Sequence, residues 1–315
     1  MSAVHNVTQG SAWPWSSRVI VVTGANAGLG LQISLRLARL GAHVVMACRS
    51  AQRAQHARQR LLDEVPAASV TTLPLDVAEP ESIRAFGAQF RAQFGQLDVL
   101  INNAGVFGLP LSRNSLGLEL QVATNYLGPF ALTGKLLPCF RDAPGARIVN
   151  VGSLAQRFGR LRVDELHGHE QGYSAWQAYA RSKVALLTYT LELNRRLRAR
   201  GSQILALAAH PGMAPTDIAK HHAVANPKSA LGKWFKKRME GWIPSVAEAA
   251  EPILHAACTE SVQGGEYYGP GGWLEIAGAP AKARVNALAY DEALARQLWS
   301  TSEALTGVSY LSEKA

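Results

Sequence analysis

Cysteine is scarce in this sequence, and long uninterrupted apolar runs are absent. The 315 residues include only Cys48, Cys139 and Cys258, which lie far apart and lack the spacing of a metal site. Such an odd, scattered set argues against a disulfide framework and favours a reducing compartment. No stretch approaches the ~20 apolar residues of a membrane-spanning helix, and the first residues lack the pattern of a signal peptide. We therefore expect a soluble, cytoplasmic protein.

Aromatic residues are also few, at 7%, and no tract of Lys and Arg is interleaved with them. A stacking surface for nucleic acid is therefore not expected. The charge balance is nonetheless basic, since 32 Lys and Arg against 23 Asp and Glu give a formal net charge of +9. This balance suits anionic or phosphate-bearing partners. With 48% hydrophobic residues, the chain has enough apolar material for a large core, which excludes disorder.

Short β-branched runs alternate with amphipathic segments from Arg18 onward. Strands are predicted at 19–23, 42–47, 70–75, 97–101, 146–151, 203–209 and within 264–276. Helices are predicted at 29–40, 51–64, 80–94, 118–140, 176–200, 245–258 and 287–305. This alternation indicates an α/β fold whose parallel sheet is covered on both faces. Right-handed crossovers make it a Rossmann-type doubly wound sheet of about seven strands, in the order 3-2-1-4-5-6-7.

One catalytic domain is expected over 18–275, because the sequence shows no internal repeat and no linker. A polar tail (1–17) precedes it and a helical C-terminal extension (276–315) follows. Residues 213–242 mix His, Lys and aromatics and are expected to form a substrate lid. Within them, the basic aromatic segment 233–242 fits either a lid helix or peripheral docking on a membrane surface. We favour the lid.

Three glycines, Gly24, Gly28 and Gly30, lie at the junction between the first predicted strand and the first predicted helix. They let the backbone turn tightly and approach a pyrophosphate, which the helix amino terminus can bind through its N–H groups. The spacing is GxxxGxG rather than GxGxxG, so an ordinary strand–turn–helix is the alternative. We predict a phosphate-binding turn that also includes Asn26 and Leu29.

The second strand ends in Arg49 and Ser50, with no carboxylate beside them. An acid at this place binds the ribose 2′-hydroxyl of NAD, whereas an Arg accommodates a 2′-phosphate. Arg49 can contact a phosphate through two N–H groups, and Ser50 can donate a further hydrogen bond. A solvated Arg at a helix start is the alternative. We expect NADP(H) rather than NAD(H).

Tyr179 and Lys183 lie four residues apart at the start of a long predicted helix. This spacing places both side chains on one helix face. An ammonium beside a phenol stabilises the phenolate and lowers its pKa from ~10 toward the range needed for acid–base catalysis. Taken alone, YxxxK is usually a surface pair.

Other motifs accompany this pair in a fixed order. The letters NNAG stand at 102–105 after a predicted strand, Asn125 lies in the next helix, Ser153 ends another strand, and PG stands at 211–212. Together with the glycine turn and YxxxK, this set resembles the short-chain dehydrogenase/reductase superfamily over about residues 18–270.

GANAGLG at 24–30, ACR at 47–49 and HPG at 210–212 resemble the retinol-dehydrogenase-like branch of that superfamily. The branch also includes WW-domain-containing oxidoreductases and protochlorophyllide reductases. Ser153 and Tyr179 are 26 residues apart, longer than usual in the superfamily, but members of this branch often carry such an insertion. Ser174 is the alternative hydroxyl, outside a strand end.

The resemblance implies four catalytic roles. Tyr179 is the general acid or base, and Lys183 lowers its pKa and holds the nicotinamide ribose. Ser153 hydrogen-bonds the substrate oxygen, and Asn125 holds a water that links Lys183 to solvent. Besides the glycine turn, Arg49, Ser50, Tyr179 and Lys183, the resemblance assigns the cofactor cleft to Asp76, Val77, Asn103, Ala104, Gly105, Pro211, Gly212 and Thr216.

We therefore expect an NADP(H)-dependent oxidoreductase that interconverts a carbonyl and an alcohol on an apolar small molecule. The alternatives are a non-catalytic NADP-binding sensor and an enzyme like protochlorophyllide reductase. No metal is expected, because the histidines lack a recurring ligand spacing. Helices 118–140 and 176–200 could pair in a homodimer or a higher homo-oligomer, unless the C-terminal extension covers them.

Overall fold

The computed structural model describes residues 14–168, 171–213 and 244–311. Thr216, the predicted lid from residue 214 onward and the basic aromatic segment 233–242 lie outside these residues. Trp15, from the predicted tail, is buried in the same apolar cluster as the first helix.

Within the described residues, eight strands form one sheet in the order β3-β2-β1-β4-β5-β6-β7-β8. All neighbours pair in parallel except β7 and β8, which are antiparallel. The strands are β1 (Val19–Thr23), β2 (His43–Cys48), β3 (Val70–Pro74), β4 (Val99–Asn102), β5 (Arg147–Val151), β6 (Leu205–Ala209), β7 (Tyr267–Pro270) and β8 (Pro280–Lys282). The predicted doubly wound sheet and its strand order are confirmed, and the structure adds one strand.

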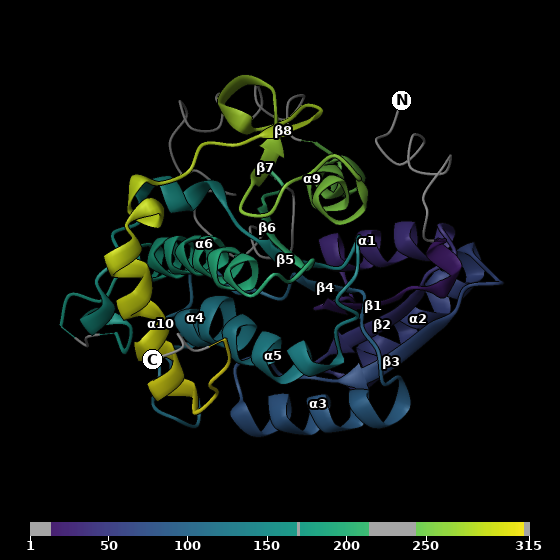
Figure 1. Cartoon of the computed structure of the whole chain (residues 1–315), viewed down its shortest axis with the longest axis horizontal. Helices are drawn as coiled ribbons and strands as arrows, with labels where there is room; N and C mark the ends of the chain where they lie inside the picture. The colour runs from purple at the N-terminus through teal and green to yellow at the C-terminus, as the bar shows by residue number, and fades with distance from the viewer. Residues whose placement is uncertain (1–13, 169–170, 214–243, 312–315) are drawn as a thin grey trace, which may run out of the picture.

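Helices cover both faces of the sheet, as Figure 1 shows. They are α1 (Gly28–Arg39), α2 (Ala51–Glu64), α3 (Pro80–Gln93), α4 (Leu120–Val122), α5 (Gly128–Leu136), α6 (Ala175–Ala199), α9 (Val246–Cys258) and α10 (Glu292–Thr306). The buried residues of α1, α2 and α9 pack on one face, and those of α3, α5 and α6 pack on the other. In doubly wound sheets, ligands bind outside the carboxyl ends of the strands.

The predicted helix 118–140 is interrupted by a π-helical turn at Ala123–Leu127. At Gly128 a Cβ would lie 2.0 Å from the Val77 carbonyl oxygen, so the helix passes very close to the loop after β3. Pro129 follows and cannot donate the α-helical bond to the carbonyl of Asn125. The interruption therefore leaves the Asn125 backbone oxygen without its usual helical donor. Such π turns are frequent at functional sites.

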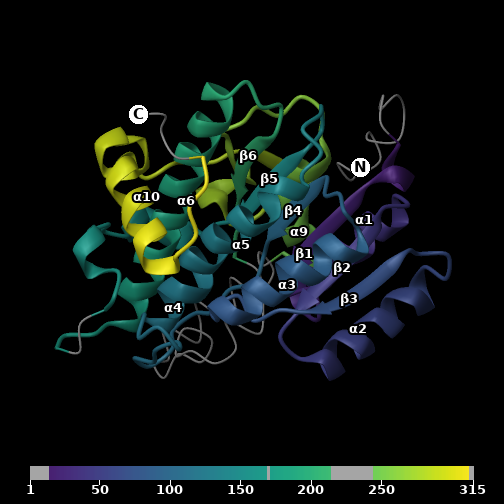
Figure 2. The same ribbon diagram turned by 60° about the horizontal axis from the view of Figure 1, so that its bottom comes forward.

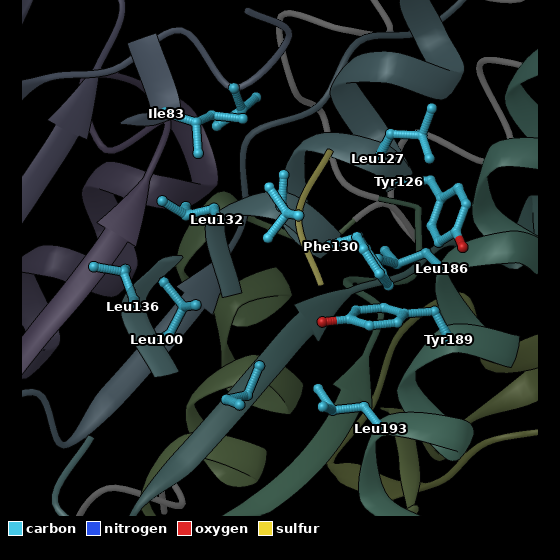
Figure 3. Packing of buried hydrophobic residues seen from close by; sticks show 14 of the residues in the cluster. Ile83, Leu100, Tyr126, Leu127, Phe130, Leu132, Leu136, Leu186, Tyr189 and Leu193 are labelled. Carbon is cyan, nitrogen blue, oxygen red and sulfur yellow. The ribbon is translucent and has the colours of Figure 1, made fainter. Parts of the chain in front are cut away.

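The C-terminal extension packs against α5 and α6 (Figure 2). The Trp299 ring of α10 is buried 5.1 Å from Phe130 and 5.8 Å from Tyr189, centroid to centroid. The Arg196 guanidinium lies 4.3 Å from the centroid of the same indole ring. Phe130 and Tyr189 point toward each other from α5 and α6 (Figure 3). The extension thus covers part of the surface considered above for dimer pairing.

Candidate active site

The glycine turn and the loop after β4 are joined by Thr23, the last residue of β1. Its hydroxyl oxygen accepts hydrogen bonds from the backbone N–H groups of Asn103 and Ala104, both at 2.9 Å. The Asn103 side chain donates to the Thr23 carbonyl oxygen at 2.8 Å. A Cβ on Gly30 would lie 2.4 Å from the Gly24 carbonyl oxygen, so only glycine fits there. These contacts place two predicted cofactor loops side by side.

Helix α1 starts in a way that suits a phosphate group. Ala27 stands at its N-cap and, among the described residues, no side chain caps the helix. Gly28 begins the helix with φ +50°, and the space where its Cβ would stand is open to 4 Å. First-turn N–H groups of a helix have no intrahelical acceptor and attract anions. Residues 28–30 therefore fit the pyrophosphate of a dinucleotide.

Arg49 lies at the carboxyl end of β2 with its side chain 76% exposed. One of its guanidinium nitrogens is 3.8 Å from an Asp76 carboxylate oxygen, across the β2–β3 edge. Asp76 also accepts a hydrogen bond from the Ala78 N–H at 3.0 Å. The Ser50 hydroxyl caps α2 by accepting from the Arg53 N–H. The three predicted side chains are thus brought to one edge, with Arg49 reaching into solvent.

Lys183 is buried beneath the end of β5. Its Nζ donates to the Val151 carbonyl oxygen at 2.8 Å and lies 5.8 Å from the centroid of the Tyr179 ring. Burial lowers the pKa of Lys183 from 10.5 to about 8. A Cβ on Gly105 would lie 3.7 Å from the same Nζ, so the NNAG loop borders the cation. Lys183 is thus buried and Tyr179 is half-buried, so the predicted pair is not an exposed surface pair.

The Tyr179 hydroxyl is hydrogen-bonded to Ser153. Burial raises the pKa of Tyr179 above its ordinary value of 10, and the Ser153 bond only partly opposes this effect. The prediction that Lys183 lowers the pKa of Tyr179 is therefore wrong for the net shift, because the effect of burial on the phenol is larger. The alternative hydroxyl, Ser174, is exposed and caps α6 by accepting from the Gln177 N–H.

Asn125 uses its side chain to hold the loop after β4. Its Oδ1 accepts from the Val106 N–H at 2.8 Å, and its Nδ2 donates to the Val106 carbonyl at 2.9 Å and to Ser182 at 3.0 Å. The water-holding role that the resemblance implies for Asn125 stays a prediction.

Two aromatic rings that no sequence motif marks lie against Tyr179, and a third lies against one of them. Phe107 packs edge-on against Tyr179 at 4.6 Å between centroids, and Trp176 lies 6.4 Å from Tyr179. Phe158 lies 6.5 Å from Trp176, and both are exposed, at 66% and 43%. Trp176 could have been found, because it lies three residues before Tyr179 on one helix face.

Side-chain hydrogen bonds connect the long segment between Ser153 and Tyr179 to the start of α4. The Tyr173 hydroxyl donates to Glu119, which is buried, at 2.9 Å. Arg181 forms an ion pair with Glu165, and Arg113 donates to the His167 carbonyl at 2.7 Å. These contacts attach the described part of the segment to α6 and to the chain just before α4.

The PG turn follows β6 directly. His210 is buried, and its ring accepts from the Gly212 N–H at 3.2 Å. Within the described residues, no three His, Cys, Asp or Glu side chains gather as a metal site. In the same part of the chain, no helix is long and apolar enough to cross a bilayer. The cytoplasmic location stays a prediction.

Comparison with known proteins identifies the family. The sequence model described as short chain dehydrogenase matches residues 18–226. The chain belongs to the short-chain dehydrogenase family. Human retinol dehydrogenases 11 and 13 are each 35% identical to this dehydrogenase over 92% of its length, and the alignments cover 86% and 85% of those proteins. The retinol-dehydrogenase-like branch is therefore confirmed.

Solved structures agree with this placement. An uncharacterised protein from Mycobacterium paratuberculosis is 34% identical, with a TM-score of 0.75 over 95% of this chain and 98% of that one. A blue fluorescent protein from a metagenomic library, solved in complex with NADPH, is 30% identical, with a TM-score of 0.61 over 81% of this chain and 96% of that one. This dehydrogenase is an oxidoreductase with a fold that binds a nicotinamide cofactor.

Proposed function

We propose that this dehydrogenase uses NADP(H) to interconvert a carbonyl and an alcohol on an apolar small molecule, with Tyr179 as the proton donor or acceptor. The observation that carries the proposal is the hydrogen-bonded pair of Tyr179 and Ser153 beside the buried Lys183. Two hydroxyls at one strand end can both contact a substrate oxygen, one to transfer a proton and one to stabilise developing charge. The nicotinamide supplies the hydride when bound.

The preference for NADP(H) rests on Arg49. It is the cation at the carboxyl end of β2, and its exposed guanidinium can turn toward a 2′-phosphate. The Asp76 carboxylate, in the loop after β3, accepts a hydrogen bond from the Ala78 N–H. The N–H groups of residues 28–30 hold the pyrophosphate at the start of α1.

The apolar substrate is supported by the rings around Tyr179. Phe107 and Trp176 flank the phenol, and Phe158 extends the aromatic surface outward. A polar substrate would leave its hydrogen-bonding groups unpaired against such rings, which is unfavourable. An apolar carbonyl compound gains from the same contact. Lys183 and Asn125 form the route by which solvent returns a proton to Tyr179.

The test compares Tyr179→Phe with Tyr290→Phe, a change at an exposed tyrosine outside the site. Oxidation of NADPH is followed with a panel of apolar aldehydes and ketones, and NADPH binding is measured by its fluorescence. Tyr179→Phe should reduce turnover by about 10²–10⁴-fold, because the proton donor is lost, and should keep NADPH binding. Full turnover by that variant contradicts the mechanism. NADPH binding by the wild type without turnover on any carbonyl favours the sensor instead.

A further inference from the structure

Glu275 stands in a strained turn at the end of β7. It belongs to the short turn Trp273–Glu275 and has φ +59°, while the preceding Leu274 has φ +50°. Side chains other than glycine rarely adopt this left-handed conformation. Such residues persist where the surroundings hold them, and they cluster at functional sites. The contacts made by the Glu275 carboxylate show what holds this turn.

The carboxylate of Glu275 joins two other loops of the sheet edge. Its Oε2 lies 3.0 Å from Nε2 of His210 and forms an ion pair with Arg157. Its Oε1 accepts from the Arg284 N–H at 3.1 Å. Because Nδ1 of His210 accepts from the Gly212 N–H, the ring proton lies on Nε2 and is donated to Glu275. One carboxylate therefore has a partner in each of the loops that follow β5 and β6.

Both partners lie in short segments that contain site residues. Arg157 lies in the short turn Leu154–Phe158, which the Ser153 hydroxyl caps. His210 immediately precedes Pro211 and Gly212, the turn that the resemblance assigns to the nicotinamide. Glu275 thus lies at the centre of a chain of contacts from the Ser153 segment to the PG turn.

The backbone is shaped around this arrangement. A Cβ on Gly269 of β7 would lie 2.0 Å from Nε2 of His210, so a larger residue there would exclude the ring from its contact with Glu275. A Cβ on Gly212 would lie 2.2 Å from the Ile276 carbonyl oxygen, so the PG turn rests against the Glu275 turn. The Tyr267 hydroxyl also donates to the Ser153 carbonyl, at 3.2 Å.

We propose that Glu275 is a positioning residue that fixes the Ser153 hydroxyl and the PG turn relative to each other through Arg157 and His210. This inference rests on the proposed function, since it assigns the two loops to substrate and cofactor. Loss of the carboxylate leaves the Arg157 charge and the His210 N–H without their common acceptor. Each loop then loses one anchor, and small displacements of catalytic groups have large kinetic effects.

The main variant is Glu275→Gln, which keeps the size of the side chain and removes its charge. Its matched control is Glu251→Gln, because Glu251 of α9 forms an ion pair with Arg36 of α1. The two ion pairs are similarly exposed: the acids at 15% (Glu251) and 14% (Glu275), and both arginines at 21%. The measurements are Tm, the Kd for NADPH by fluorescence, and kcat at saturating NADPH, all on the full chain well below Tm.

Glu275→Gln should raise the Kd for NADPH and lower kcat by about tenfold each. Two further variants separate the effect on the Ser153 segment from the effect on the PG turn. Arg157→Gln should mainly lower kcat, since it frees the Ser153 segment, and His210→Asn should mainly raise the Kd, since it keeps an acceptor for Gly212 and loses the donor to Glu275. Glu251→Gln should lower Tm comparably and change Kd and kcat by less than about twofold.

The inference is overturned if Glu275→Gln lowers Tm as Glu251→Gln does and leaves both constants unchanged. It is equally overturned if Arg157→Gln and His210→Asn change Kd and kcat to the same extent. Failure of the proposed function gives a different result, namely a wild type without turnover. In that case the Kd measurements on Glu275→Gln and His210→Asn still decide whether Glu275 positions the PG turn.

Discussion

Replacing Lys183 by methionine should remove activity and make the protein more stable at neutral pH. The folded-state pKa of Lys183 is about 8, against 10.5 for an unperturbed lysine, because the ammonium is buried. At about 1.4 kcal/mol per pKa unit, the buried charge destabilises the fold by about 3 kcal/mol below pH 8. Methionine has no charge to bury, but it loses the bond to the Val151 carbonyl, which is worth about 1–3 kcal/mol. The net gain at pH 7 is therefore at most about 2 kcal/mol.

The pH dependence gives the sharper test. Between pH 8 and pH 10.5 the folded wild type has released the Lys183 proton while the unfolded chain still binds it. The unfolded state then binds more protons, so the wild type gains stability as the pH rises. The difference in unfolding free energy between Lys183→Met and the wild type should shift by about 3 kcal/mol toward the wild type between pH 7 and 10.5.

Urea unfolding at a series of pH values measures this difference, and Lys135→Met, on the partly exposed surface of α5, serves as the control. Groups remote from Lys183 titrate alike in both proteins and cancel in the comparison. A difference that stays constant across the pH range would refute the reasoning, because the burial of a charge could not then be its cause. A Lys183→Met variant with retained turnover would refute its catalytic part.

Two further changes test the extension and the cofactor preference. Trp299→Ala should lower the unfolding free energy by about 3–5 kcal/mol, because the ring is buried against α5 and α6 and covers Arg196; a loss below about 1 kcal/mol in urea unfolding would contradict that packing. Arg49→Ala should raise the KM for NADPH by about tenfold and leave the KM for NADH unchanged, because one charge-assisted contact to the 2′-phosphate is lost. Equal changes for both cofactors would contradict the assigned preference.

The alternation of short apolar runs with amphipathic segments predicted the seven parallel strands, because the strands of a sheet that is buried on both faces are apolar throughout. The eighth strand could not be predicted in this way. Pro280–Lys282 is three residues long, carries a proline and a lysine, and pairs only along the edge with β7. Edge strands of this kind are short and polar. Their position depends on the preceding turn, not on their own sequence.

The helix predicted over 118–140 shows a second limit of periodicity. The apolar spacing identified its buried face correctly, but the interruption lies beside a contact distant in sequence, between Gly128 and the Val77 carbonyl. Pro129 was visible in the sequence and can begin a helix as well as break one. Only the fold decides between the two, and here Pro129 lies in the first turn of α5, directly after the π-helical turn.

The motif residues were found because acid–base and phosphate chemistry needs particular side chains at particular spacings. Phe107 and Glu275 carry no such pattern. Phe107 reaches Tyr179 across 72 residues of sequence, and Glu275 reaches Arg157 across 118. Their roles follow from the packing of loops at the sheet edge. An aromatic or an acid in a glycine-containing loop is indistinguishable from a surface residue until the fold is known.

Burial acts on the two central groups in opposite directions, which bears on how the proton moves. It raises the pKa of Tyr179 and lowers that of Lys183 to about 8. At neutral pH the phenol is then held in its neutral form, which is the form that donates a proton to a carbonyl. Lys183 remains mostly charged at pH 7 but has a pKa near the working range, so it can exchange a proton with solvent at little cost. The same burial makes Tyr179 a weaker acid than a free tyrosine, so in the mechanism we propose the transfer of its proton depends on Ser153 and Lys183, which stabilise the phenolate as it forms.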